Sequence, residues 1–230
     1  MSSTHKIYFK DIPIINVPIG RPNILVEEGN MIEISEKYER SCIHNFANND
    51  RPGGPSSTFN NAGYLINHHE KSNTQEDQII RYYNPLFNKS YKSTLILPHS
   101  LYPIIDESIQ NSEALLYSIC PPHKPVITLP SVIGFNPNKQ KIYKKHESMV
   151  KRILLLLYVS TINNHVLITG LWGCGAFGIN PSHIVSFWKE ALTTSKYFPP
   201  LIIFVIKKDE YTLKYDNLTE MFKELQLINK

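Results

Sequence analysis

The sequence predicts a three-layer α/β/α domain built on a mixed, mostly parallel β-sheet. Short apolar runs at Val126–Leu129, Val166–Thr169 and Leu201–Ile206 have the length and the β-branched composition of buried strands. Segments with a helical spacing of apolar residues alternate with these runs. They are Lys139–Ile162, the segment that begins at Pro181, and Leu218–Leu227. Because alternating strands and helices build parallel sheets with helices on their faces, this order favours an α/β fold.

The first half of the chain is less regular. Ile24–Val26 and Met31–Ile34 are predicted to be two short strands joined by a hairpin turn at Glu27–Asn30. The remaining predicted elements are strands at Cys42–Phe46, Thr94–Leu97 and Ala114–Ser118, and a helix that begins at Thr74 and ends before Pro85. Between them lies Ala47–Thr74, which is long, polar and rich in Asn, Ser, Gly and Pro. A loop of this kind inside a compact domain is usually functional or disordered.

The length of 230 residues suits one domain with a sizeable core. No internal repeat and no second boundary is visible, so a single domain is expected over residues 1–230. Residues 1–22 mix apolar residues and prolines without a long period. They are predicted to be an N-terminal extension that lies on the domain.

Composition excludes several classes of protein. The three cysteines are widely spaced and form neither a disulfide framework nor a Cys-x-x-Cys pair. The longest apolar run, Ile153–Val159, is too short to span a bilayer, and the first residues do not resemble a secretory signal. We therefore expect a cytoplasmic protein without a membrane partner, with the nucleus as the alternative compartment. The net charge of +4 suits an anionic small ligand but does not establish nucleic-acid binding. His68–His69 has no partner at ligand spacing, so no metal site is expected.

A strand, a glycine-rich loop and a helix N-terminus follow one another around residue 170. Four glycines follow the strand that ends at Thr169, and Asn180 with Pro181 then predicts a helix N-cap with proline in the first turn. Glycines allow backbone N–H groups to approach a phosphate, and the helix dipole favours its charge. The alternatives are a tight turn without a ligand and the dinucleotide fingerprint Gly173-x-Gly175-x-x-Gly178. The fingerprint is weak here because only one further strand and one short helix remain after it.

Three further motifs flank the long loop. Asn45-Phe46-Ala47-Asn48 ends a predicted strand, Arg51-Pro52-Gly53-Gly54-Pro55 follows, and Gln75-Glu76-Asp77 opens the next helix. Taken alone, the two acids fit helix capping better than catalysis. Thr74 with Asp77 resembles a capping box, and acids in a first helical turn complement the dipole.

In this order, the motifs resemble those of the microbial-type poly(ADP-ribose) glycohydrolases, a branch of the macro-domain fold. The resemblance runs from about Ile24 to Ile206, and its most specific part is Gly170–Pro181. The chain departs from the family pattern in three places. Pro55 replaces the third glycine, Ser56–Thr74 is much longer than the family's segment, and Asp77 replaces the second glutamate.

The resemblance implies an ADP-ribose pocket at the C-terminal ends of the strands, with no cofactor and no metal. It implies that Glu76 positions ribose hydroxyls, and that Asp77 protonates the leaving oxygen and then activates water. It implies that Phe177 stacks near the distal ribose. The other implied substrate-binding residues are Asn45, Ala47, Asn48, Gly53, Gly54 and Gln75 on the ribose side, and Gly173, Cys174, Gly175, Ala176 and Gly178 around the pyrophosphate.

The sequence therefore predicts a metal-independent ADP-ribosyl glycohydrolase. Its expected substrates are poly(ADP-ribose) or ADP-ribosylated protein, with nucleic acid a partner only as a modified substrate. Carboxyl groups that give and take a proton suit cleavage of a glycosidic bond through an oxocarbenium-like transition state. Two alternatives stay open: a non-catalytic ADP-ribose-binding reader that uses the same pocket, and an NAD-dependent oxidoreductase built on Gly173–Gly178.

Overall fold

A computed structural model gives the fold of the chain. It describes residues 3–46, 57–59, 65–68, 75, 78–79, 82, 114–119, 122–129, 142–174, 179–208, 212–213, 215 and 217–229. The predicted strand at Thr94–Leu97 lies outside these residues.

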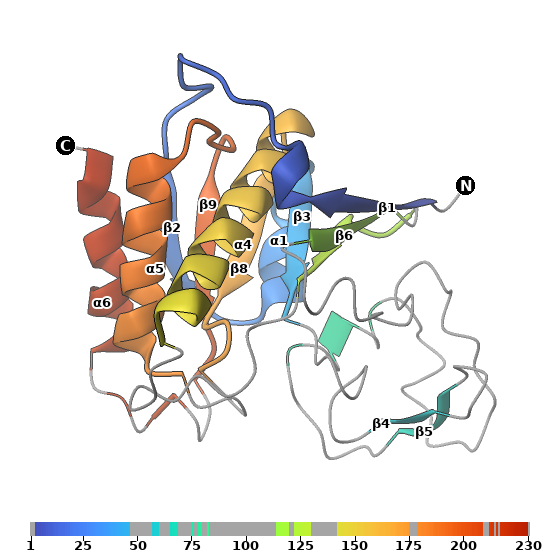
Figure 1. The fold of residues 1–230 in the computed structure, drawn as a ribbon. Coiled ribbons are helices and arrows are strands. Elements are labelled where there is room, and N and C mark those ends of the chain that lie inside the picture. The colour runs from blue at the N-terminus through green and yellow to red at the C-terminus, as the bar shows by residue number, and fades with distance from the viewer. Residues whose placement is uncertain are drawn as a thin grey trace.

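Seven of the described strands form one sheet in the order β1-β6-β7-β3-β8-β9-β2 (Figure 1). Their bounds are β1 Ser3–Tyr8, β2 Ile24–Glu28, β3 Ser41–Asn45, β6 Ala114–Ile119, β7 Val126–Thr128, β8 Val166–Gly170 and β9 Ile202–Ile206. The pairs β7–β3, β3–β8, β8–β9 and β9–β2 are parallel, whereas β1–β6 and β6–β7 are antiparallel. The prediction of a mixed, mostly parallel sheet is therefore confirmed.

Helices cover both faces of this sheet, as predicted for a three-layer α/β/α domain. Their bounds are α1 Met31–Glu36, α4 Ile142–Ile162, α5 Pro181–Thr194 and α6 Leu218–Lys223, with short 3-10 segments at η1 Phe9–Asp11 and η4 Glu224–Asn229. One buried cluster joins α4, α5 and α6 to the face of the sheet that carries Cys42 and Leu167. A second cluster joins α1 to the opposite face, which carries Ile43 and Ile168. Successive side chains of a strand point to opposite faces of the sheet, so each strand packs against helices on both sides and three layers result.

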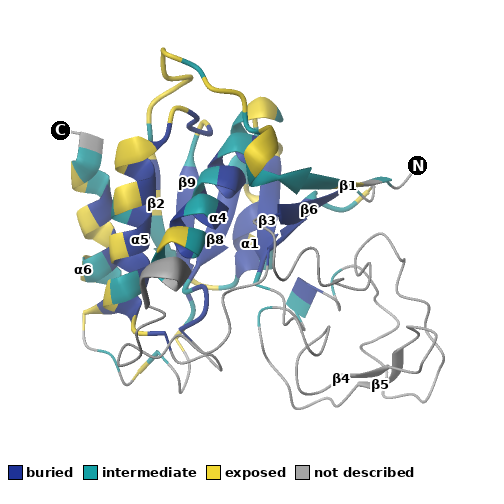
Figure 2. Cartoon of the chain, in the orientation of Figure 1, coloured by how far each residue is buried: buried dark blue, intermediate teal, exposed yellow. Residues whose placement is uncertain are grey.

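The central strands β8 and β9 are buried almost throughout, which explains their mostly apolar sequences. All five residues of β9 and of β3 are buried (Figure 2). On α5 the predicted apolar face is the buried one. Its members Ile184, Val185, Trp188, Ala191 and Leu192 all pack into the core.

The predicted strand at Met31–Ile34 is wrong, because these residues form helix α1. Asn30 caps this helix, since its side chain accepts a hydrogen bond from the backbone N–H of Ile32 at 2.8 Å. Met31 and Ile34, one helical turn apart, are both buried. The predicted hairpin turn at Glu27–Asn30 is therefore absent: Glu27 and Glu28 belong to β2, and Gly29 leads into the capped helix.

Two further segments differ from the expectation. Within the predicted N-terminal extension, Ser3–Tyr8 form β1, which pairs with β6 over its whole length. Within the long polar segment, β4 Ser57–Phe59 and β5 Leu65–His68 form a separate antiparallel pair. Both segments consist mainly of polar residues without an apolar–polar alternation, so neither gave a strand signal.

Candidate functional site

The C-terminal ends of five parallel strands lie along one edge of the sheet, the lower edge in Figure 1. β3 ends at Asn45 and its neighbour β8 ends at Gly170, and the residues that follow both strands are those singled out by the sequence motifs. Ligands of open α/β sheets bind outside this edge. The topology therefore brings the Asn45 motif and the glycine loop to one place.

Two positions in this region favour glycine, one because of a close contact and one because of its backbone conformation. A Cβ on Gly170 would lie 2.5 Å from the carbonyl oxygen of Val205, so only glycine lets β8 end this close to β9. Gly173 has a φ of 82°, in the left-handed region that favours glycine. The backbone N–H of Ile179 donates to the carbonyl of Gly173 at 2.9 Å. This bond joins the two residues that flank the segment 174–178.

The loop leads directly into helix α5, whose N-terminus is built as the sequence predicts. Asn180 is the N-cap, and its Oδ1 accepts from the backbone N–H of Ser182 at 3.0 Å. Pro181 occupies the first turn, where its missing N–H costs nothing. The helix dipole therefore places partial positive charge at the sheet edge.

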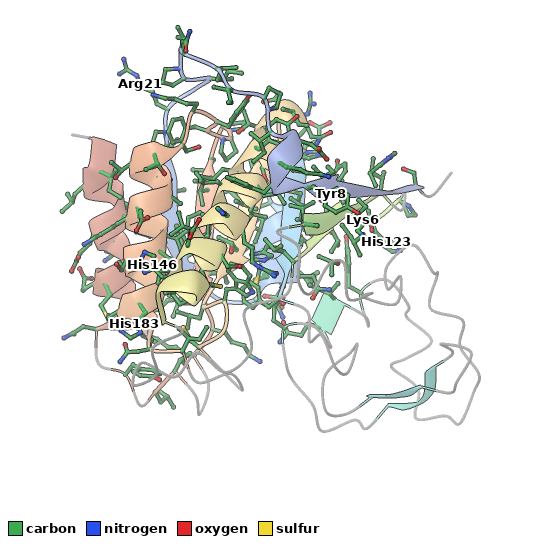
Figure 3. All side chains as sticks on the ribbon, in the orientation of Figure 1. Lys6, Tyr8, Arg21, His123, His146 and His183 are labelled. Carbon is green, nitrogen blue, oxygen red and sulfur yellow. The ribbon has the colours of Figure 1, made fainter. Side chains whose placement is uncertain are left out.

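Helix α5 is also held against α4 near this end. Figure 3 shows His146 and His183 at the lower ends of α4 and α5. His146 Nε2 lies 2.6 Å from Glu190 Oε2, and its ring meets Phe187 edge-on at 4.7 Å between centroids. These contacts join the first turns of α4 to the middle of α5.

His44, in the middle of this edge, is fully buried. Its Nδ1 lies 3.0 Å from Thr169 Oγ1, and its ring meets Phe46 and Trp172 edge-on, each at 4.9 Å. Burial lowers the pKa of His44 to about 3, so the ring is neutral at working pH. A neutral ring at this position contributes packing and a hydrogen bond to the core.

Gln75 binds the end of β3 with both atoms of its amide. Its Nε2 donates to the carbonyl of His44 at 2.6 Å, and its Oε1 accepts from the backbone N–H of Phe46 at 3.1 Å. This is the donor–acceptor pattern that a neighbouring strand would supply. The side chain therefore fixes the last residues of β3 to the helical residue that precedes the acidic pair.

Three more described helical residues continue the face that begins at Gln75. Asn30 Nδ2 donates to Gln78 Oε1 at 2.8 Å, Ile79 is buried, and Tyr82 donates a hydrogen bond to Glu36. The spacing of i, i+3, i+4 and i+7 is that of one face of a helix. The predicted helix after Thr74 is thus confirmed at these positions, and this face docks on β3 and α1.

A shallow, open depression of about 370 Å³ continues the same edge beyond β9. It is lined by Glu28, Gly29, Asn30, Lys207 and Lys208, which follow the ends of β2 and β9. Lys208 pairs with Glu28 at 2.7 Å. The two lysines give this part of the edge positive charge.

Four of the predicted site residues are described. Asn45 is buried, with its Nδ2 lying 3.4 Å from Thr128 Oγ1, and Cys174 is a buried free cysteine. Gln75 and Gly173 lie at the ends of β3 and β8 as given above. The others lie outside the described residues: Ala47, Asn48, Gly53, Gly54, Glu76, Asp77, Gly175, Ala176, Phe177 and Gly178. Their roles stay predictions.

Within the described part of the chain, no group of three or more His, Cys, Asp or Glu side chains could hold a metal ion. In the same residues, no helix is both long enough and apolar enough to cross a membrane.

The layers, the strand order and the loop at the β8–α5 junction define a macro-domain-like α/β fold. No family model and no curated protein matches the sequence. Among solved structures, the chain is similar to bacterial poly(ADP-ribose) glycohydrolases, so the resemblance inferred from the motifs is confirmed for the fold.

One of these structures is the Deinococcus radiodurans enzyme in complex with ADP-ribose. It matches with a TM-score of 0.61 and 16% identity over 97% of this chain and 94% of that chain. The Thermomonospora curvata enzyme matches with a TM-score of 0.63 and 14% identity over 96% and 85%. The same enzyme bound to the inhibitor ADP-HPD also gives 0.63 and 14%, over 96% and 84%.

Two features of the site were not predicted. His44 was not singled out, although a histidine that follows Cys42 and Ile43 and directly precedes Asn45 is a usable signal. The docking of Gln75 on β3 joins residues 31 positions apart, and no local pattern announces such a pairing.

Proposed function

We propose that this protein is a metal-independent ADP-ribosyl glycohydrolase that cleaves ribose glycosidic bonds in poly(ADP-ribose) or in ADP-ribosylated protein. One observation carries the proposal. The chain shares its fold, over 97% of its length, with a poly(ADP-ribose) glycohydrolase in complex with ADP-ribose. Its own motifs follow the strands that end at the ligand-binding edge of such a sheet.

The binding half of the proposal rests on the β8–α5 junction. Gly173 adopts a conformation that favours glycine, and α5 directs its N-terminus toward the same edge. Backbone N–H groups and a helix dipole are the usual means of binding a pyrophosphate. The net charge of +4 also favours binding of an anionic ligand such as a pyrophosphate.

The chemical half rests on Glu76 and Asp77. A carboxyl group that protonates the leaving oxygen and then takes a proton from water suits this hydrolysis. Asp77 is one methylene shorter than the glutamate it replaces, so we expect slow turnover. The same substitution favours the second candidate function, a reader that binds ADP-ribose without cleaving it.

The test is calorimetry with ADP-ribose, followed by hydrolysis assays on the same sample. Poly(ADP-ribose) and a mono-ADP-ribosylated protein are the substrates, each with and without a chelator. The proposal expects binding, and product release that the chelator does not change. Binding without turnover of either substrate would leave the reader. Binding of NAD(H) with hydride transfer would instead support the oxidoreductase.

A further inference from the structure

We infer that Gln75 is a positioning residue of the proposed reaction: it holds the helix that carries Glu76 and Asp77 against the end of β3. The inference rests on the proposed function. It assigns the Gln75 amide to the protein backbone, whereas the family resemblance assigns this residue to the substrate.

The geometry of the amide is the first argument. Nε2 lies 2.6 Å from the carbonyl oxygen of His44, and Oε1 lies 3.1 Å from the backbone nitrogen of Phe46. One side chain thus satisfies a donor and an acceptor on either side of Asn45. Removing it would leave two backbone groups of a buried strand end without these partners, which is costly.

The rest of the same helical face is the second argument. Gln78 is bonded to Asn30 and Tyr82 to Glu36, so these two bonds reach the cap of α1 and α1 itself and not the end of β3. Gln75 supplies a bond to β3, the strand that leads into the Asn-Phe-Ala-Asn motif. Glu76 and Asp77 follow Gln75 directly in the sequence. A fixed position of Gln75 therefore restricts where Glu76 can lie.

His44 extends this connection to the glycine loop. Its carbonyl accepts from Gln75, while its ring is bonded to Thr169, the residue before Gly170. His44 therefore connects Gln75, the residue before the acidic pair, with Thr169, the residue before Gly170. A catalytic carboxyl must lie within hydrogen-bond reach of the reacting oxygen, and a displacement of about 1 Å from its productive position costs roughly 10²-fold in rate.

The experiment compares Gln75→Glu and Gln75→Leu with a matched control, Gln78→Leu, on the same helical face. Melting temperature, affinity for ADP-ribose and single-turnover hydrolysis of poly(ADP-ribose) are measured for each protein. We expect both Gln75 variants to hydrolyse roughly 10²-fold more slowly than wild type. Affinity for ADP-ribose should stay near the wild-type value, and Gln78→Leu should retain its rate.

The pH profile adds a readout that a purely structural role would not move. In Gln75→Glu the carboxylate can still accept from Phe46 but repels the His44 carbonyl. Once protonated, it can donate to that carbonyl again. The hydrolysis rate of Gln75→Glu relative to wild type should therefore recover on acidification. The rate of Gln75→Leu should show no such recovery.

Several results would overturn the inference. Weakened ADP-ribose binding with an unchanged rate would make Gln75 a substrate-binding residue. Rates equal to that of Gln78→Leu would remove the positioning role, and unfolding of both Gln75 variants would make the amide a stability element only. In each of these cases the proposed function still stands, provided that the wild-type protein hydrolyses the substrate. An inert wild type would overturn the proposed function and this inference together.

Discussion

His44 and Thr169, on neighbouring parallel strands, share a buried hydrogen bond of 3.0 Å between Nδ1 and Oγ1. The histidine side of this bond has no access to water, which keeps the ring neutral and depresses its pKa to about 3. The bond therefore connects β3 to β8 without placing a charge in the core.

The stability of the fold should consequently depend on pH. The unfolded chain carries His44 with its ordinary pKa near 6.5, so between that pH and about pH 3 the unfolded state binds one proton more than the folded state. His44 should therefore lower the free energy of unfolding by about 1.4 kcal/mol for each pH unit of acidification in this window, and should have no effect above it. Denaturant titrations of wild type and His44→Asn at several pH values measure the difference in slope. Equal slopes would show that His44 is protonated in the folded state.

Gly170→Ala should destabilise the domain. The added methyl group would lie 2.5 Å from the Val205 carbonyl, and a backbone atom in a central strand cannot move away cheaply. We expect a loss of about 1–3 kcal/mol in the free energy of unfolding. Chemical denaturation measures it, and a variant as stable as wild type would mean that β8 and β9 can separate at this point.

Gly175→Glu should abolish ADP-ribose binding while the domain stays folded. The new carboxylate would stand where the pyrophosphate is proposed to bind, and its Cβ would obstruct close approach of the backbone. Calorimetry on a sample with a wild-type circular dichroism spectrum is the measurement. Gly175→Ala is the uncharged control that separates bulk from charge. Undiminished affinity in the folded glutamate variant would place the ligand elsewhere.

Asp77→Asn should nearly stop hydrolysis, because loss of a general acid–base typically costs about 10²–10⁴-fold in rate. The amide keeps the size of the side chain, so ADP-ribose should still bind. Glu76→Gln should also slow turnover and weaken binding of the scissile ribose. If the acids only cap the helix, both variants will instead lose melting temperature and keep their activity per folded molecule.

Shortening Ser56–Thr74 to a few residues should change the preference between polymer and mono-ADP-ribosylated protein more than the affinity for free ADP-ribose. Long polar loops at such positions commonly shape substrate choice. Competition between the two substrates in one assay measures this preference. Unaltered rates on both substrates would show that the segment has no part in selection.

The fold class was predictable because its signals are local. Val166–Thr169 is a buried strand, Gly170 and Gly173 mark the turn, and Asn180 with Pro181 marks the helix start, each within a few residues of the next. Met31–Ile34 was misassigned because a four-residue segment is too short to distinguish a strand from a helical turn. The capping bond of Asn30, which decides the matter, is a structural detail.

The internal support of the site was not predictable in the same way. The hydrogen bond from His44 to Thr169 joins residues 125 positions apart, and the bonds of Gln75 depend on how its helix docks on β3. Such contacts arise from tertiary packing, on which local propensity and periodicity carry no information. Motif order located the candidate site, and the packing around it became visible only in three dimensions.

The bond from Ile179 N–H to the Gly173 carbonyl has a consequence for protein engineering. This bond joins Gly173 to Ile179, directly before the Asn180 cap, so the two anchors of the segment between them are held together where α5 begins. The cost of closing a loop grows only slowly with its length. We therefore expect segments of other lengths and compositions to be accepted between these two anchors, which makes the junction a candidate acceptor for loops taken from other proteins.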